Sequence, residues 1–281
     1  MNAFNQIQIE TTTACNASCP MCPREKAERG GGTMSTEMFW NVVDDAVKLG
    51  VQHIVPFING DPFADKRMPV FIYELAARYP HINVIIYTNG SLITKEGAEM
   101  VMAAGNVGTF NVSMQGGDKE TLERNMGISW DDVMRNMDML IEMAETYKRP
   151  KIRANMCIFS KTEHTKQAFI DRWQGRAEIC LGTFSNFGGM THDPAESATR
   201  EWKRLLCDRG TKHIYVYWNG DVGQCCFDLL GSVVHGNVRE QSLIEVVKGA
   251  SFLRAREAHY ALDVANMPKI CHACNACKFH G

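Results

Sequence analysis

The sequence has no long hydrophobic run and almost no net charge. No apolar stretch approaches the ~18 residues of a transmembrane helix, so we expect no membrane span. The first six residues show neither a basic nor an apolar stretch, which predicts no signal peptide and a cytoplasmic location. With 30 Lys and Arg against 32 Asp and Glu, the net charge is −2, and nucleic acid is not expected as a partner.

Cysteine, by contrast, is abundant. The chain holds 11 cysteines, and most of them stand in closely spaced groups. An odd count in a long chain without an export signal does not fit a secreted disulfide protein. Closely spaced cysteines in such a chain are typical of metal sites.

Strand and helix patterns alternate six times in the first two thirds of the chain. Apolar and alternating segments predict strands near 6–12, 53–58, 82–87, 109–113, 151–159 and 179–184, with helices between them. This order is typical of an α/β fold whose parallel strands are joined by helical crossovers. Ligands of such folds bind at the carboxyl ends of the strands.

The pattern changes after Phe187. The sequence predicts a linker at 188–194, a polar helix near 195–206 and a hairpin that turns at Asn219-Gly220. A cysteine-rich end follows two more helical stretches. We therefore expect a large domain over residues 1–190 and a small α+β domain over residues 191–281.

Three cysteines follow the first predicted strand. Cys15, Cys19 and Cys22 have the spacing C-x3-C-x2-C, so one short loop can bring three thiolates together. Thiolates favour zinc, copper(I) or iron–sulfur clusters. A [4Fe–4S] cluster held only by protein needs four cysteines, and no fourth cysteine or histidine stands nearby. Such a set leaves one metal position open, as in sites that perform chemistry.

Three further motifs stand at or directly after the ends of predicted strands. They are Asn59-Gly60-Asp61-Pro62, Thr88-Asn89-Gly90 and Asn111-Val112-Ser113-Met114. Each motif alone is a common turn or strand end. In this order, with the cysteine loop, they resemble the motifs of the radical SAM superfamily. The resemblance implies a partial (β/α)6 TIM barrel.

The resemblance also implies the cofactors and their contacts. Cys15, Cys19 and Cys22 would hold three irons of a [4Fe–4S] cluster, and S-adenosylmethionine would bind the fourth. The implied contacts to S-adenosylmethionine come from five residues: Gly60, Asp61, Pro62, Thr88 and Ser113. The sequence departs from the usual Gly-Gly-Glu-Pro motif by Asn59 and by the shorter carboxylate of Asp61, and Met21 replaces the usual aromatic residue. Arg153 is either a partner of the cofactor carboxylate or a surface arginine.

The C-terminal cysteines resemble a second known arrangement. Cys207, Gly220 and Cys225 follow the pattern C-x12-G-x4-C, and Cys271, Cys274 and Cys277 end the chain. This resembles the SPASM/Twitch extension of radical SAM enzymes, which carries auxiliary iron–sulfur clusters. The resemblance implies one auxiliary [4Fe–4S] cluster on Cys207, Cys225, Cys271 and Cys274, with Cys277 as an alternative ligand. A structural zinc site is the rival interpretation.

Two residues near the hairpin have alternative interpretations. Cys226 is either a buried thiol, an alternative ligand or a donor of a hydrogen atom to a substrate radical. Asp228 is either a base for a substrate hydroxyl or a cap of the hairpin end.

The expected activity follows from the two clusters. The implied chemistry is reductive cleavage of S-adenosylmethionine to a 5′-deoxyadenosyl radical, which abstracts a hydrogen atom. A second cluster held only by protein would conduct electrons, so we expect a net two-electron oxidation of a small hydroxylated metabolite, with an external flavodoxin or ferredoxin as electron donor. The early cysteine loop favours this over the alternative, a peptide-modifying enzyme, because such enzymes commonly carry an N-terminal recognition domain. A non-catalytic metal-binding protein is the third hypothesis.

Overall fold

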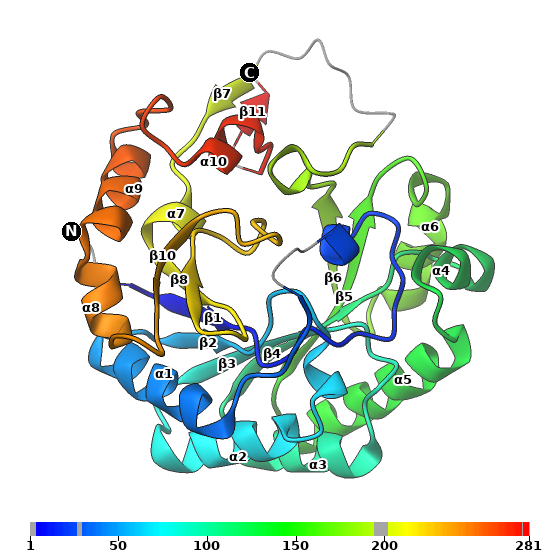
Figure 1. Cartoon of the computed structure of the whole chain (residues 1–281). Coiled ribbons are helices and arrows are strands. Elements are labelled where there is room, and N and C mark those ends of the chain that lie inside the picture. Colours follow the sequence, from blue (N-terminus) through cyan, green and yellow to red (C-terminus); the bar gives the residue numbers. More distant parts are fainter. Residues whose placement is uncertain (1–3, 27–29, 194–201, 277, 281) are drawn as a thin grey trace. The chain divides into compact units, whose positions relative to one another are not determined.

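The structure is a computed structural model that describes residues 4–26, 30–193, 202–276 and 278–280. The chain forms two compact units (Figure 1). The first, here called the α/β unit, comprises Ala14–Pro20 and His53–Phe184. The second, here called the terminal unit, comprises Met1–Thr13, Met21–Gln52 and Ser185–Gly281.

The α/β unit contains a parallel sheet with the strand order β2-β3-β4-β5-β6. Its strands are β2 (His53–Val55), β3 (Asn83–Thr88), β4 (Val107–Ser113), β5 (Lys151–Ile158) and β6 (Glu178–Thr183). Each is joined to the next through helices, which confirms the predicted α/β fold.

Several helices of this unit begin and end at residues that favour helix ends. They are η2 (Pro62–Ala64), α2 (Met68–Arg78), α3 (Lys95–Ala104), α4 (Lys119–Met126), α5 (Trp130–Tyr147), η3 (Glu163–Thr165) and α6 (Lys166–Trp173). Thr94 and Ser129 cap α3 and α5 by accepting backbone N–H groups. Gly105 ends α3 with a positive φ of 71°.

The two faces of the parallel sheet differ in chemistry. One face is apolar and fully buried, with Ile86, Phe110, Val112 and Ala154 each 0% exposed. Helices α2, α3 and α5 lie along the outside of these strands (Figure 1). The other face carries Tyr87, Asn111, Arg153 and Glu178, which stand next to one another in the strand register. We call these four residues and their neighbours the polar face of the sheet.

The terminal unit joins the start of the chain to its end. Strand β1 (Gln6–Ile9) pairs in parallel with β8 (His213–Val216), and β9 (Asp221–Gly223) and β10 (Val234–Asn237) extend the sheet in antiparallel fashion. The turn between β8 and β9 is Asn219-Gly220, as predicted. Its helices are η1 (Pro23–Lys26), α1 (Thr36–Lys48), η4 (Phe187–Gly189), α7 (Asp208–Thr211), α8 (Leu243–Lys248), α9 (Ala250–Tyr260) and α10 (Lys269–Ala273).

The predicted polar helix near 195–206 is wrong where the structure describes it. Residues 194–201 lie outside the described residues, and Trp202–Arg204 form strand β7 instead. This strand pairs antiparallel with β11 (Lys278–His280), so its backbone hydrogen bonds come from residues more than 70 positions away. Local patterns carry no information about such a partner.

The division into domains 1–190 and 191–281 stays a prediction. The compact units divide the chain differently, because β1 belongs with β8 in the terminal unit. No helix among the described residues is long and apolar enough to span a membrane.

Candidate functional site

The loop with Cys15 and Cys19 is held at the ends of the strands of the α/β unit. The backbone N–H of Asp61, after β2, donates to the carbonyl of Ala14 at 2.8 Å. The backbone N–H of Ser18 donates to the carbonyl of Met126 at 2.8 Å. The loop is therefore fixed on both sides of Cys15, which is half-buried, as is Cys19. Cys22 is also half-buried and directly precedes η1 in the terminal unit.

Asp61 links the first two predicted motifs. Its carboxylate accepts hydrogen bonds from the Thr88 hydroxyl at 2.9 Å, the Asn89 N–H at 2.7 Å and the Phe63 N–H at 2.9 Å. The side chain is 3% exposed, and burial raises its pKa although these donors oppose the rise. The structure thus brings the two predicted site residues Asp61 and Thr88 together. The carboxylate of Asp61 is hydrogen-bonded within the protein. Its contact to S-adenosylmethionine stays a prediction, as do those of Gly60, Pro62 and Thr88.

Asn89 connects this motif to the cysteine loop. Its side-chain amide donates to Asn16 Oδ1 at 2.9 Å and faces Cys15 Sγ at 3.7 Å. Its Oδ1 accepts from the hydroxyl of Ser91 at 2.7 Å, and that hydroxyl accepts from Asn16 Nδ2 at 2.9 Å. Neutral amide donors therefore face the first thiol. A half-buried thiol with such donors fits a cluster ligand, because N–H groups stabilise a thiolate.

The polar face of the sheet places Ser113 and Arg153 near each other. Ser113 ends β4 and stands beside Asn155 in the register. Arg153 Nη2 forms an ion pair of 2.8 Å with Glu178, which raises the pKa of the arginine and lowers that of the glutamate. Two buried donors on this face have no hydrogen-bond partner, Arg153 Nε and Asn155 Nδ2. They fit a bound molecule with oxygen acceptors, as the carboxylate and ribose of S-adenosylmethionine supply.

The C-terminal cysteines gather in the terminal unit. The thiol of Cys207 lies close enough to Cys225, Cys271 and Cys274 to raise their pKa values. Burial is the largest cause for Cys271, whose pKa rises to about 12, and for Cys274. The four predicted ligands are therefore brought together in one unit. Cys277, the predicted alternative, lies outside the described residues.

Cys226 belongs to the same group. The thiol of Cys225 donates to Cys226, which lowers the pKa of Cys226 and raises that of Cys225. Arg209 and the hydroxyl of Tyr215 also favour the thiolate of Cys226. Burial opposes the positive charge of Arg209, but Cys226 and Cys225 raise its pKa overall. A cation among thiols fits an anionic, thiolate-bound group.

Asp228 is fully buried in the turn after these cysteines. Its carboxylate accepts hydrogen bonds from the Ser232 N–H at 2.9 Å, the Ser232 hydroxyl at 2.8 Å and the Val233 N–H at 2.9 Å. This arrangement favours the alternative of a cap for the loop after the hairpin. The role as a base stays a prediction.

No three His, Cys, Asp or Glu side chains converge on a single metal ion within the described ranges. All described cysteines are free of disulfides, and Cys157 and Cys180 lie in β5 and β6.

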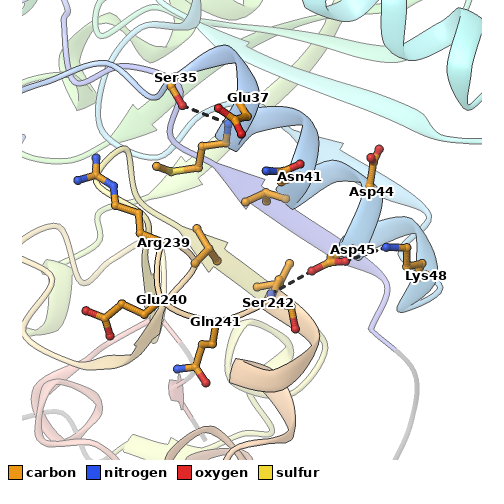
Figure 2. Close-up of a pocket in the computed structure, with 14 residues that line it drawn as sticks. Ser35, Glu37, Asn41, Asp44, Asp45, Lys48, Arg239, Glu240, Gln241 and Ser242 are labelled. Carbon is orange, nitrogen blue, oxygen red and sulfur yellow. Dashed lines mark hydrogen bonds and ion pairs between the residues drawn. The ribbon is translucent and has the colours of Figure 1, made fainter.

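A polar groove of about 630 Å³ lies elsewhere in the terminal unit, between α1 and the segment that leads into α8 (Figure 2). Asp45 fixes its two walls, because it pairs with Lys48 at 3.1 Å and accepts the Leu243 N–H at 3.1 Å. Its walls are lined by charged and polar side chains and contain no cysteine. The groove therefore has no part in the cluster sites.

Comparisons with known proteins define the class of protein. The sequence matches the radical SAM superfamily over residues 9–147 and the SPASM iron–sulfur cluster-binding domain over residues 207–278. The chain therefore belongs to the radical SAM superfamily and carries a C-terminal SPASM-type domain. It binds S-adenosylmethionine and a [4Fe–4S] cluster through the first domain and auxiliary iron–sulfur through the second.

Curated relatives match in part. A PqqA peptide cyclase of Granulibacter bethesdensis is 32% identical over 43% of this chain and 31% of its own length. An S-adenosyl-L-methionine-dependent 2-deoxy-scyllo-inosamine dehydrogenase of Niallia circulans is 25% identical over 41% of this chain and 47% of its own length. The match thus spans less than half the length of each of these relatives.

Solved structures share the fold over most of the chain. BtrN in complex with AdoMet has a TM-score of 0.68 at 18% identity and covers 98% of this chain and 94% of BtrN. Streptococcus suis SuiB bound to the precursor peptide SuiA has a TM-score of 0.74 at 15% identity and covers 90% of this chain and 67% of SuiB.

Sequence reasoning missed two groups of this site. Asn89 was visible only as part of a turn motif, and its bond to the cysteine loop depends on a contact 73 residues away. Arg209 had no signal beyond its position two residues after Cys207.

Proposed function

We propose that this radical SAM enzyme oxidises a small hydroxylated metabolite by two electrons. The observation that carries the proposal is the second cysteine group, in which Cys225, Cys271 and Cys274 interact with Cys207. Four protein thiolates leave no open position on a cluster, so such a cluster accepts or passes electrons. We assign one auxiliary [4Fe–4S] cluster to these four cysteines.

The first site has a different task. When bound there, the cluster and S-adenosylmethionine supply a radical that abstracts a hydrogen atom. Cys15, Cys19 and Cys22 hold the cluster, while Asn89 orients Cys15 and Asp61 fixes the turn that carries Asn89. Ser113, Arg153 and Asn155 bind the oxygen atoms of the cofactor or substrate on the polar face of the sheet.

The proposed reaction is balanced in atoms and electrons. With both groups bound, one electron would be consumed when S-adenosylmethionine and the hydrogen atom of the substrate give methionine and 5′-deoxyadenosine. The substrate would lose that hydrogen atom, its hydroxyl proton and one electron, and the second cysteine group would hold the cluster that accepts this electron. The secondary alcohol becomes a ketone. An external flavodoxin-type or ferredoxin-type donor supplies the entering electron.

The polar face supports a small hydroxylated substrate. Arg153 Nε and Asn155 Nδ2 are buried donors without partners, and hydroxyl oxygens can accept from both. The dehydrogenase from Niallia circulans, whose name gives an aminocyclitol as substrate, supports the same class. The cytoplasmic location stays a prediction.

A peptide substrate is the second candidate. It is favoured by the relatives named PqqA peptide cyclase and by the likeness to SuiB, whose structure holds a precursor peptide. The same clusters would then serve the modification of a peptide side chain.

Deuterium transfer separates these candidates. Reduced, fully loaded enzyme is incubated anaerobically with S-adenosylmethionine and carbon-deuterated aminocyclitols or polyols. We expect deuterium in 5′-deoxyadenosine and one ketone product for each molecule of 5′-deoxyadenosine. Transfer only from labelled peptides would refute the small-molecule proposal. Absence of any 5′-deoxyadenosine would refute S-adenosylmethionine cleavage by this chain.

A further inference from the structure

Arg209 occupies a central place among the C-terminal cysteines. It lies in α7, which begins directly after Cys207. Its guanidinium carbon is 4.7 Å from the ring centroid of Phe227, which directly follows Cys225 and Cys226. The side chain therefore connects the first cysteine of the group to the cysteines of the hairpin.

Arg209 has no acidic partner among the described residues. The carboxylate next to it in sequence, Asp208, pairs with Lys212 at 2.9 Å instead. The groups that Arg209 faces are the thiols of Cys226, Cys225 and Cys207 and the phenol of Tyr215, and only Cys226 among them has a lowered pKa. A half-buried cation without a carboxylate is unfavourable unless another anion compensates it. A thiolate-bound cluster is such an anion.

The aromatic neighbours hold the guanidinium in place. Phe227 packs edge-on against Phe187, with 5.3 Å between the ring centroids. The guanidinium of Arg209 lies over the ring of Phe227. Arg209 itself is half-buried, so water reaches it only in part. The field of a charge is stronger where water is excluded, so Arg209 acts strongly on the cysteine group.

We propose that Arg209 is a potential-setting residue that makes the auxiliary cluster easier to reduce. The proposal rests on the proposed function, because it assumes an iron–sulfur cluster on this cysteine group. Reduction adds one negative charge to a ligand set that is already anionic. A fixed cation beside that set stabilises the reduced form, which raises the reduction potential. The cluster then takes up the electron that the oxidised substrate must release.

The other nearby arginine has a different role. Arg204 Nη2 donates to the carbonyl of Cys271 at 2.6 Å, so it holds the turn with Cys271 and Cys274. Its charge also favours the thiolates of Cys271 and Cys274 and so adds to the effect of Arg209. Within the described residues, Arg209 has no hydrogen bond to the backbone, and its side chain instead bonds the thiol of Cys226.

Redox titration of the loaded enzyme tests the proposal. Three variants are compared with the parent: Arg209→Gln, which removes the charge, Arg209→Lys, which keeps it, and the control Lys212→Gln, which removes a neighbouring charge paired with Asp208. The midpoint potential is followed by EPR, and the auxiliary signal is the one that remains when Cys15, Cys19 and Cys22 are replaced by Ala.

We expect Arg209→Gln to lower the ratio of reduced to oxidised auxiliary cluster about tenfold at a fixed potential, or about 59 mV for one electron. Arg209→Lys and Lys212→Gln should stay within about twofold of the parent. An unchanged midpoint in iron-loaded Arg209→Gln would overturn the proposal. If Arg209→Gln does not load iron, the test depends on Arg209→Lys, which keeps the positive charge. A tenfold change in the ratio of reduced to oxidised auxiliary cluster in Arg209→Lys would also overturn the proposal.

Failure of the proposed function has another signature. Parent protein that holds about four irons or zinc in place of the second cluster refutes the auxiliary cluster, whatever the variants do. Parent protein with about eight irons keeps that assignment and leaves the potential as the measure of Arg209.

Discussion

The two cysteine groups differ in their surroundings. The thiols of Cys15 and Cys19 are half-buried, and the side-chain amide of Asn89 faces Cys15. Cys271 is buried, and the group around it contains the cation Arg209 and the aromatic ring of Phe227. The first group suits a cluster that exchanges ligands with a substrate-like cofactor. The second suits a closed cluster that only changes its charge.

The largest expected effect comes from removing the first group. Replacement of Cys15, Cys19 and Cys22 by Ala should abolish formation of 5′-deoxyadenosine and leave about four of eight irons. The reason is that the second group has its own four thiolates. Iron analysis and chromatography of the nucleoside measure both outcomes. A triple variant without any iron would show that the C-terminal cysteines do not hold a cluster.

Removing one ligand of the second group should separate cleavage from oxidation. Cys207→Ala is expected to keep formation of 5′-deoxyadenosine but to lose product by at least about 100-fold, because the substrate electron has no acceptor. Met100→Ala, on an exposed residue of α3, is the control and should behave like the parent. Unchanged product in Cys207→Ala would argue against electron transfer through this group.

A smaller effect is expected at the carboxylate that supports the first group. Asp61→Asn replaces an acceptor of three hydrogen bonds with a side chain that also donates, so the free energy of unfolding should fall by about 2–3 kcal/mol. Urea denaturation measures the change. The control Asp138→Asn, whose exposed carboxylate pairs with Arg176, should be near parental. Equal stability of both variants would contradict the supporting role of Asp61.

The smallest effect concerns pH in the terminal unit. Burial lowers the pKa of His235 from 6.5 to about 4. Its Nε2 donates to Gln224 Oε1 at 3.0 Å, and its Nδ1 accepts from Ser251 at 3.0 Å, so the native ring is neutral. As the pH falls below 6.5, His235 is protonated in the unfolded chain while it stays neutral in the folded chain. The titration of His235 alone should therefore lower the free energy of unfolding by about 1 kcal/mol from pH 7.5 to 5.5, in addition to the contribution of His259, whose pKa burial also lowers to about 4.

His235→Gln provides the matching control for that pH effect. It keeps an amide near Gln224 but cannot titrate, so its unfolding free energy should change less between the same two pH values. Urea curves of both proteins at pH 7.5 and 5.5 give the difference. Identical pH dependence in both would assign the titration to another group.

Much of the α/β unit could be predicted from local signals. Ser129, Thr94 and Gly105 mark helix ends because capping depends on residues a few positions apart. The strands were visible as apolar runs, and parallel order follows from the helical crossovers. The site motifs were visible because each stands at or directly after the end of a strand.

Other features could not be predicted because their partners are distant in sequence. Strand β7 forms only through pairing with β11, and β1 joins β8 across more than 200 residues. The orientation of Asp61 toward Thr88 depends on a contact 27 residues away in sequence. The group around Arg209 depends on the packing of three separate segments, which no local pattern contains.

The hydrogen bonds of the first cysteine loop also bear on how the enzyme acquires its cluster. Asp61, Asn89 and Met126 hold the loop by protein contacts alone. The loop loses its conformational entropy when the protein folds, so this loss does not weaken the binding of the metal. We therefore expect that iron and sulfide can rebuild a lost cluster on this loop without refolding of the chain.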